Sequence, residues 1–337
     1  MLPDTGNISN STAFISDSKV IPAVSVIQTP IDVVSETESE ASLPQAAHSV
    51  SPVAPQPMLS QRKCETSRAK RTLAAFSLEG KVCVVTGGAS GIGLGICKSI
   101  LESGGQVAIV DLNVVAAHEQ AKQLVETYEQ ENHEEVSPLV TSHAADVASP
   151  ASIDLAINSV LSKHGHIDHL VTCAGICENI SAIDYPHSRM QKLWSINVDG
   201  SFYFATAVAR HLMQRKSEGS IVLIGSMSGS IVNVPQMQAP YNISKAAVKQ
   251  MARTLGVEWA EYGIRVNCIS PGYVRTALTD EIIKSNPALY AEWVSRTPVK
   301  RLGKPSDIAG AVVFLLSDLS TYMTGSEILI DGGYTSI

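Results

Sequence analysis

A glycine-rich turn between a buried strand and an amphipathic helix limits most strongly how this chain can fold. Lys81–Val85 is an almost continuous apolar run, typical of a strand buried on both faces of a parallel sheet. Thr86–Gly93 follows with glycines at 87, 88, 91 and 93, of which 87, 91 and 93 form the motif, and Leu94–Leu101 then has apolar residues at helical spacing. Glycines let the backbone approach a phosphate closely, and a helix N-terminus offers free N–H groups. The order of strand, glycine-rich turn and helix predicts a phosphate-binding unit. A tight turn that binds no ligand would have the same pattern, and the glycine spacing departs from GxGxxG.

An acidic residue at the end of the next strand supports the first interpretation. Gln106–Val110 is again apolar, and Asp111 follows it, 24 residues after Gly87. A carboxylate at this position can accept hydrogen bonds from the ribose hydroxyls of an adenosine, and its charge would repel a 2′-phosphate. Neither Thr86–Gly93 nor Leu112–Asn113 contains Lys or Arg. The sequence therefore favours NAD as the cofactor, with NADP as the alternative.

Strands and helices alternate through the rest of the chain. Helices are expected at about 114–132, 150–163, 186–214, 241–262 and 305–317, with a mobile segment between Gly272 and the last of them. Further strands are expected within 136–144, at 166–175 with its exit turn, and at 220–224, 264–269 and 327–330. This alternation predicts an α/β fold: a single Rossmann-type, doubly wound parallel sheet with helices on both faces, which binds ligands at the carboxyl ends of its strands.

Several motifs occur in a fixed order along residues 78–335. They are Thr86–Gly93, Asp146, Ala174-Gly175, Asn197, a serine, Tyr241-x3-Lys245 and Pro271-Gly272. On these motifs the chain resembles the short-chain dehydrogenase/reductase family, which implies NAD(P)-dependent oxidation of alcohols or reduction of carbonyls by a homotetramer. Thr172-Cys173 departs from the two asparagines that precede Ala-Gly in the family, which puts one side-chain role there in doubt.

The resemblance also implies which residues bind the cofactor. Asp146, at a strand end, is expected to reach the adenine amino group. The expected cofactor contacts are Gly87, Ser90, Gly91, Ile92, Gly93, Asp111, Asp146, Val147, Ala174, Gly175, Tyr241, Lys245, Pro271, Gly272, Val274 and Thr276.

Tyr241 is the candidate acid/base for moving the hydroxyl proton. A free phenol has a pKa of about 10, too high for an efficient base at neutral pH. Lys245 lies four residues on, on the same helical face, so its ammonium and the charge of the oxidised nicotinamide are expected to lower that pKa. By resemblance, Lys245 also holds the nicotinamide ribose, and Asn197 holds a helix kink and a water relay to Lys245.

Two serines are candidates for the hydrogen bond that stabilises the substrate oxygen. Ser228 has the more common family spacing, 13 residues before Tyr241, whereas Ser226 directly follows the strand that ends near Gly225. We favour Ser226 because a strand end fixes geometry more firmly than loop length.

Amide side chains are frequent in the loop that precedes Tyr241. Asn233–Asn242 contains Gln236 and Gln238, and Glu178-Asn179 follows the fourth strand. Ser226, Ser228, Gln236 and Tyr241 are the expected substrate contacts. The lining favours a polyhydroxylated substrate, and the pattern Pro-Gln-x-Gln-x-Pro-Tyr-Asn resembles fungal polyol dehydrogenases and ketose reductases of the family.

That resemblance implies interconversion of a polyol and a ketose, with D-arabinitol to D-ribulose using NAD as the first candidate. Mannitol- or sorbose-type activity is an alternative, as is reduction of a 3-oxoacyl or other carbonyl. A cofactor-binding redox sensor without turnover is the alternative from another class of protein.

Composition separates the N-terminal residues from the rest. Residues 1–60 hold 11 Ser, 4 Thr and 7 Pro without a sustained period, so 1–75 is expected to be a disordered tail and 76–337 the dehydrogenase domain. The net charge of −7 and the lack of an 18-residue apolar run argue against nucleic-acid and membrane partners. The tail lacks a signal peptide and is acidic, which favours the cytoplasm over mitochondria. No metal is expected: the His164–His169 segment lies at the opposite end of the sheet from the catalytic residues, and Cys173 and Cys177 are expected to pack in the core.

Overall fold

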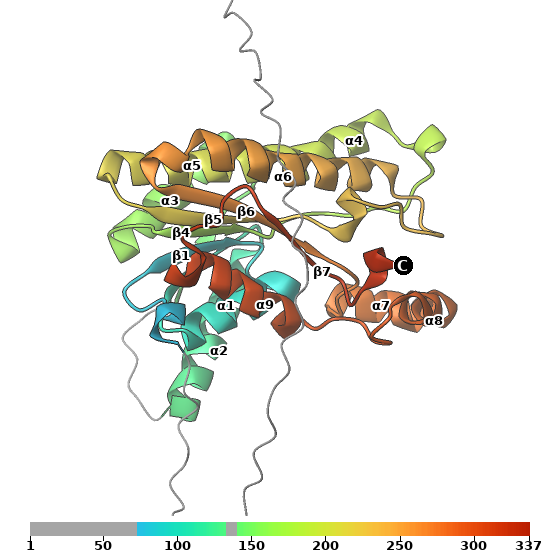
Figure 1. The fold of residues 1–337 in the computed structure, drawn as a ribbon, viewed down its shortest axis with the longest axis horizontal. Coiled ribbons are helices and arrows are strands. Elements are labelled where there is room, and N and C mark those ends of the chain that lie inside the picture. Colours follow the sequence, from blue (N-terminus) through green and yellow to red (C-terminus); the bar gives the residue numbers. More distant parts are fainter. Residues whose placement is uncertain (1–72, 133–139) are drawn as a thin grey trace, which may run out of the picture. The chain divides into compact units, whose positions relative to one another are not determined.

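Seven parallel strands form one sheet within residues 73–132 and 140–337, which are the residues that the computed structural model describes (Figure 1). The strand order is β3-β2-β1-β4-β5-β6-β7. The strands are β1 (Val82–Thr86), β2 (Gln106–Asp111), β3 (Val140–Ala144), β4 (His169–Thr172), β5 (Gly219–Ile224), β6 (Ile264–Pro271) and β7 (Glu327–Ile330). The predicted fold class is confirmed.

Helices cover both faces of the sheet (Figure 1). One face packs on α1 (Gly91–Glu102), α2 (Val114–Asn132) and α9 (Pro305–Leu316). The other face packs on α3 (Pro150–His164), α5 (Gly200–Arg215) and α6 (Ala239–Glu258). Side chains of β1 alternate between the two cores, with Cys83 and Val85 in the first and Val84 in the second. This alternation explains why the strand is apolar at consecutive positions.

Local sequence signals set the ends of α3. The Ser149 hydroxyl accepts a hydrogen bond from the backbone N–H of Ser152, and Pro150 occupies the first turn. Gly165 ends the helix in the left-handed conformation, at φ 79°. The helix therefore ends where the sequence predicted, and the chain turns directly into β4.

The segment after β6 differs from its prediction. It was expected to be mobile, but it contains α7 (Ala277–Ser285) and α8 (Pro287–Arg296). Asn286 caps α8 by accepting a hydrogen bond from the Leu289 N–H, and Pro287 begins it. This Asn-Pro pair was the sequence signal for a helix that the prediction missed.

Most of the predicted tail lies outside the described residues. Residues 1–72 carry no structural description; from the end of the predicted tail, Ala74–Phe76 forms a short 3₁₀ turn, and Phe76 packs against the core. Within the described ranges, none of the helices has the length and apolar character needed to cross a membrane.

Two buried histidines make the fold sensitive to acid. His143 on β3 and His169 on β4 are 3% and 5% exposed, and burial lowers the pKa of each to about 4. An unfolded histidine titrates near pH 6.5, so between about pH 6.5 and 4 the unfolded chain binds more protons. The free energy of unfolding therefore falls as the pH falls, by up to about 1.4 kcal/mol per pH unit for each residue. We expect a lower melting temperature at pH 5 than at pH 7, measured by circular dichroism.

A single substitution tests this assignment. His143→Gln should reduce the loss of stability between pH 7 and pH 5, because it removes one of the two groups. His118→Gln is the matched control, since His118 lies exposed on α2. An equal pH dependence in wild type and His143→Gln would contradict the role of His143.

Candidate active site

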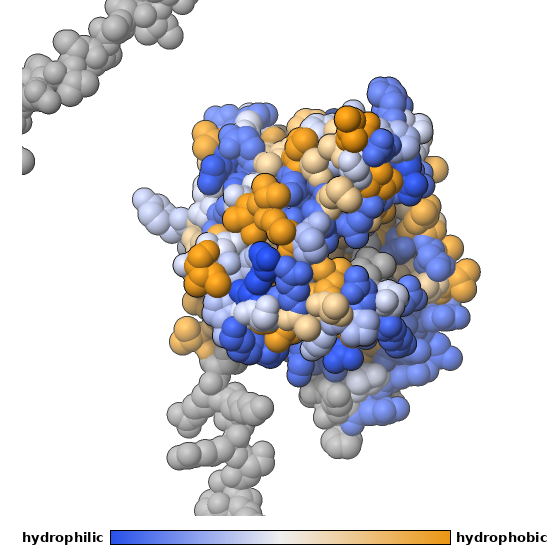
Figure 2. All heavy atoms as spheres, turned by 90° about the vertical axis from the view of Figure 1, so that its right-hand side faces the viewer, coloured by the Kyte–Doolittle hydropathy of each residue, from blue (hydrophilic) through white to orange (hydrophobic). Residues whose placement is uncertain are grey.

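The carboxyl ends of all seven strands meet at one edge of the sheet. The strand order reverses between β1 and β4, where Thr86 and Thr172 are register partners. Ligands of doubly wound sheets bind in the crevice at such a switch point. Figure 2 looks onto this side of the molecule, where hydrophilic and hydrophobic side chains are interspersed.

The glycine-rich turn lies directly at this crevice. Gly87 has φ +65°, and a Cβ there would lie 2.8 Å from the Ala174 backbone. A Cβ on Gly93 would lie 2.2 Å from the Gly87 carbonyl oxygen, so a side chain at either position would displace the backbone. Ser90 precedes α1 without a side-chain capping bond, which leaves the first N–H groups of α1, from Gly91, Ile92 and Gly93, for an anion.

Two acidic residues follow β2 and β3. The Asp111 carboxylate accepts hydrogen bonds from the N–H groups of Ala89 (3.1 Å) and Asn113 (3.0 Å), so it lies against the glycine turn. Asp146 accepts one from the Ala148 N–H at 2.9 Å, and the next residue, Val147, is buried. Both carboxylates therefore lie at the edge of the sheet where an adenosine is expected.

The exit of β4 is tied to β1 by one hydroxyl. Thr86 Oγ1 accepts hydrogen bonds from the N–H groups of Cys173 (3.1 Å) and Ala174 (3.3 Å). The next residue, Gly175, lies beside the catalytic candidates, because a Cβ there would be 3.3 Å from Asn197 Oδ1 and 3.7 Å from Lys245 Nζ. The backbone of this turn thus joins the cofactor crevice to those candidates.

The segment after β6 closes the crevice from the other side. Pro271 ends β6, and Gly272 lies against the Asp331 backbone. Val274 is buried and pairs with Gly303 in a short parallel bridge. The Thr276 methyl group faces the glycine turn, since a Cβ on Gly91 would lie 3.4 Å from it.

Tyr241 and Lys245 lie one turn apart on α6. Lys245 is 6% exposed, its Nζ donates a hydrogen bond to the Ile224 carbonyl at 2.8 Å, and Nζ lies 5.8 Å from the centre of the Tyr241 ring. Burial lowers the pKa of Lys245. Burial also raises the pKa of the Tyr241 phenol, whereas its hydrogen bond with Ser226 lowers that pKa. In the chain alone the net shift of Tyr241 is upward, opposite to the sequence expectation, which included the charge of the nicotinamide.

Ser226 and Ser228 occupy different positions relative to Tyr241. Ser226 follows β5 and Gly225, and it hydrogen-bonds Tyr241. Its hydroxyl also donates to Ser228 Oγ at 3.1 Å and accepts from the Ser228 N–H at 3.2 Å. Ser228 is 6% exposed. The geometry therefore brings Ser226 against the phenol and makes Ser228 a buried support for it.

Asn197 lies in a π-helical turn, Ser195–Asp199, between α4 (His187–Trp194) and α5. Its amide is fully buried: it accepts a hydrogen bond from the Ile176 N–H and donates to the Ile176 carbonyl and to the Ser244 hydroxyl, at 2.9–3.0 Å. Ser244 directly precedes Lys245. Asn197 therefore lies at an irregular point between two helices, and π-helical turns of this kind occur frequently at functional sites.

The predicted substrate-lining residues have partners within the chain. Gln236 donates to the Tyr273 hydroxyl at 3.1 Å, and Gln238 donates to Asn179 Oδ1 at 2.8 Å. Glu178 is held by Arg189, which donates at 2.6 Å, and by the Tyr185 hydroxyl. The carboxylate of Glu178 is therefore engaged in an ion pair with Arg189.

Two residues of this region were missed or misjudged. Tyr273 was not selected, although its place directly after Pro271-Gly272 was a signal. Cys177 was expected in the core but is exposed, and it accepts a hydrogen bond from Gln238 Nε2 at 3.1 Å.

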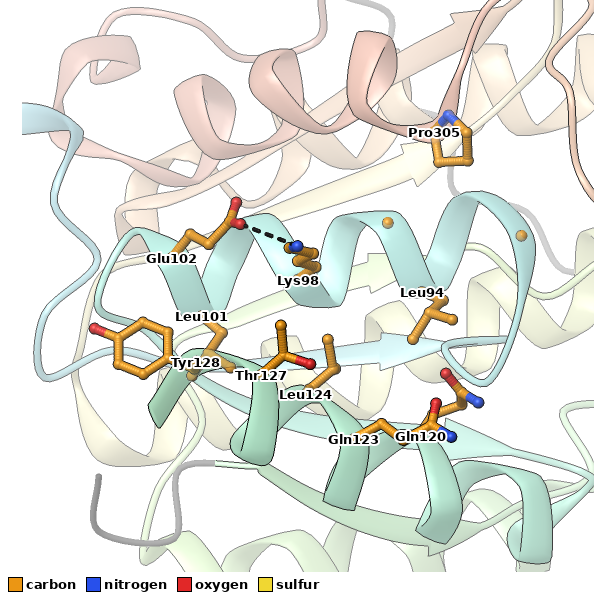
Figure 3. A pocket seen from close by; sticks show the side chains of 12 residues that line it. Leu94, Lys98, Leu101, Glu102, Gln120, Gln123, Leu124, Thr127, Tyr128 and Pro305 are labelled. Atoms are coloured by element: carbon orange, nitrogen blue, oxygen red, sulfur yellow. Dashed lines mark ion pairs between the residues drawn. The ribbon is translucent and has the colours of Figure 1, made fainter. Parts of the chain in front are cut away.

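A separate groove lies between α1 and α2 (Figure 3). It has a volume of about 330 Å³ and is lined by Leu94, Leu101 and Leu124, with the Lys98–Glu102 ion pair at its rim. Tyr241 and Lys245 do not line it. Among the described residues, no cluster of His, Cys, Asp or Glu has the arrangement of a metal site.

Comparison with known proteins agrees with this geometry. Residues 87–335 match the protein family described as Enoyl-(Acyl carrier protein) reductase. The chain is 39% identical over 265 residues to D-arabinitol 2-dehydrogenase [ribulose-forming] of Candida albicans, covering 77% of this chain and 94% of that one. It is also 39% identical over 265 residues to the NADH-dependent L-xylulose reductase of Ambrosiozyma monospora, covering 77% and 97%.

A solved structure has the same fold. The gluconate 5-dehydrogenase of Burkholderia cenocepacia, in complex with NADP and tartrate, is 31% identical, with a TM-score of 0.70 over 78% of this chain and 98% of that one. The match of motifs, sheet order and relatives leads to one conclusion: the chain belongs to the short-chain dehydrogenase/reductase family of NAD(P)-dependent oxidoreductases.

Proposed function

We propose that this enzyme is an NAD-dependent polyol dehydrogenase that oxidises a secondary hydroxyl of a polyol to a ketose, with D-arabinitol to D-ribulose as the first candidate. The observation that carries the proposal is the meeting of Ser226, Tyr241 and Lys245 at the carboxyl edge of the sheet, beside the glycine turn. The relatives named for polyol and ketose reactions support the choice of substrate class.

The residues of the crevice fit a nicotinamide dinucleotide. Glycine at 87 and 93 lets the backbone of the turn pack closely on itself and on Ala174. The N–H groups at the N-terminus of α1 beside this turn suit a pyrophosphate. Asp111 would hold the adenosine ribose, Lys245 the nicotinamide ribose, and Pro271–Thr276 the nicotinamide end. When bound, the cofactor supplies hydride acceptance and a positive charge near Tyr241. The carboxylate of Asp111 supports NAD over NADP because it would repel a 2′-phosphate.

The chain's own residues would handle the proton. Tyr241, as phenolate, would accept the proton of the substrate hydroxyl, and Lys245 would stabilise that phenolate. Ser226 would donate a hydrogen bond to the substrate oxygen as negative charge develops on it. Asn197 would help to position Lys245, because its amide hydrogen-bonds the preceding residue, Ser244, and the backbone of Ile176. These roles need the hydroxyl of the substrate within hydrogen-bond distance of both Ser226 and Tyr241.

A panel of substrates tests the proposal. Polyols and ketoses of five and six carbons are offered with NAD(H) and with NADP(H), and turnover is followed by nicotinamide absorbance. We expect kcat/KM to be highest for a polyol, with NAD preferred over NADP. A preference for a 3-oxoacyl or other simple carbonyl would contradict the substrate class, and a strong preference for NADP would contradict the role of Asp111.

The sequence makes three further predictions about the whole protein. The homotetramer, the cytoplasmic location, and a tail over 1–75 before a dehydrogenase domain over 76–337 stay predictions. The sensor alternative predicts a protein that binds the cofactor but turns over no alcohol, and the same panel distinguishes it.

A further inference from the structure

Tyr273 joins four segments of the chain, among them the loop that leads into α6 and Tyr241. Its ring stacks on Trp293 of α8, with ring centres 4.4 Å apart and 13° between planes, and it meets the edge of Tyr334 near the C-terminus at 5.5 Å. Its hydroxyl contacts Asn233 and Gln236 of the loop before α6. The loop that contains Gln236, an expected substrate contact, is therefore held by hydrogen bonds to the hydroxyl of Tyr273.

The hydrogen bonds of this phenol have a definite direction. Asn233 Nδ2 and Gln236 Nε2 both donate to the Tyr273 oxygen at 3.1 Å, which occupies its two acceptor positions. The Tyr273 hydroxyl also donates toward Gln236 Oε1, and the 3.4 Å between these two oxygens is long for an O–H···O bond. Both amides thus turn their nitrogens toward Tyr273, and the acceptor capacity of the Gln236 oxygen is largely unused.

Two buried polar atoms of the same cluster have no hydrogen-bond partner among the residues that the structure describes. They are Asn233 Oδ1, an acceptor, and Trp293 Nε1, a donor, on side chains that are 2% and 3% exposed. A buried polar atom without a hydrogen bond is costly. The cluster around Tyr273 is therefore polar but incompletely paired, which makes the hydrogen bonds of its phenol to Asn233 and Gln236 important for holding the loop.

We propose that Tyr273 is a positioning residue for the substrate: it holds the Gln236 amide so that Oε1 accepts a hydrogen bond from a substrate hydroxyl away from the reacting carbon. This inference rests on the proposed polyol dehydrogenase function and names the device that selects polyols over simple secondary alcohols. Tyr273 acts through Gln236, whereas Ser226 and Tyr241 act on the reacting hydroxyl itself.

The substitution Tyr273→Phe removes only the hydroxyl and keeps the ring on Trp293. We expect KM for the best polyol of the panel to rise about five- to tenfold, the effect of losing one hydrogen bond. The KM for NAD, and kcat at saturating polyol, should stay within about twofold. Tyr290→Phe, the same change on α8, is the matched control and should leave all three constants unchanged.

A double-mutant cycle distinguishes positioning from loss of structure. In Gln236→Leu the KM for the polyol should rise to a similar extent, and adding Tyr273→Phe should raise it little further, because both changes remove one interaction. If the rises in polyol KM of the two single variants multiply in the double variant, the proposal is overturned. The same holds if Tyr273→Phe raises the KM for NAD as much as the KM for the polyol. The proposal would also be overturned if the wild type oxidises polyols and Tyr273→Phe has the same KM for the polyol. A wild type that oxidises no polyol contradicts the proposed function instead, and this is seen before any variant is made.

Discussion

Tyr241→Phe should lower kcat for alcohol oxidation by about 10²–10⁴-fold, the usual contribution of a general acid or base. Phenylalanine keeps the buried ring in place on α6 but removes the oxygen that would accept the substrate proton. Oxidation needs the phenolate of Tyr241, and burial raises the pKa of this phenol in the chain alone, so wild-type oxidation should accelerate as the pH rises. Steady-state absorbance from about pH 6 to about pH 10, the ordinary pKa of a phenol, measures both kcat of the variant and the pH dependence of the wild type.

Cofactor binding separates loss of chemistry from loss of the site. The Kd for NADH, from fluorescence titration, should stay within a few-fold in Tyr241→Phe, because the glycine turn and Asp111 are untouched. Tyr322→Phe, at a fully exposed tyrosine, should retain full activity. Substantial turnover by Tyr241→Phe, or an equal loss in Tyr322→Phe, would be incompatible with Tyr241 as the acid/base.

Ser226→Ala should lower kcat by about 10²–10³-fold, as loss of one donor to a developing oxyanion does. The hydroxyl of Ser226 would donate to the substrate oxygen, and it also hydrogen-bonds Tyr241. Its removal should therefore weaken the stabilisation of the alkoxide and raise the pKa of Tyr241, moving the pH profile of oxidation to higher pH. Steady-state kinetics at several pH values measures both effects.

Ser228→Ala is the control that the chain itself offers. Ser228 supports Ser226 through its backbone N–H, which alanine keeps, and through its hydroxyl, which alanine lacks. Ser228→Ala should therefore cost less than about tenfold, the effect of one supporting hydrogen bond. A larger loss in Ser228→Ala than in Ser226→Ala would reverse the assignment of the two serines.

Features encoded within a short stretch of chain could be predicted from the sequence. The glycine turn lies between one strand and one helix, so its own residues are enough to predict the turn and to indicate a phosphate-containing ligand. Tyr241 and Lys245 are four residues apart, and helical periodicity alone brings them to one face. Strand ends were accurate where polar residues interrupt apolar runs, as at Asp111.

Features that depend on distant partners could not be predicted in the same way. The ion pair between Glu178 and Arg189 of α4 joins residues 11 positions apart and has no local sequence signal. Tyr273 is a hub because residues 37 and 40 positions earlier reach its hydroxyl. The upward pKa shift of Tyr241 follows from burial under several elements. Local sequence signals do not specify such tertiary contacts.

The hydroxyl of Thr86 has a consequence for how precisely this enzyme can work. One oxygen binds two successive N–H groups of the β4 exit, and thereby clamps the half of the sheet that would hold the dinucleotide to the half that leads to Asn197 and Lys245. Hydride and proton transfer are both acutely sensitive to donor–acceptor separation. Because the two halves are joined in the middle of the sheet, we expect substitutions in the loops around the crevice to change the choice of substrate more than the spacing of the reacting groups.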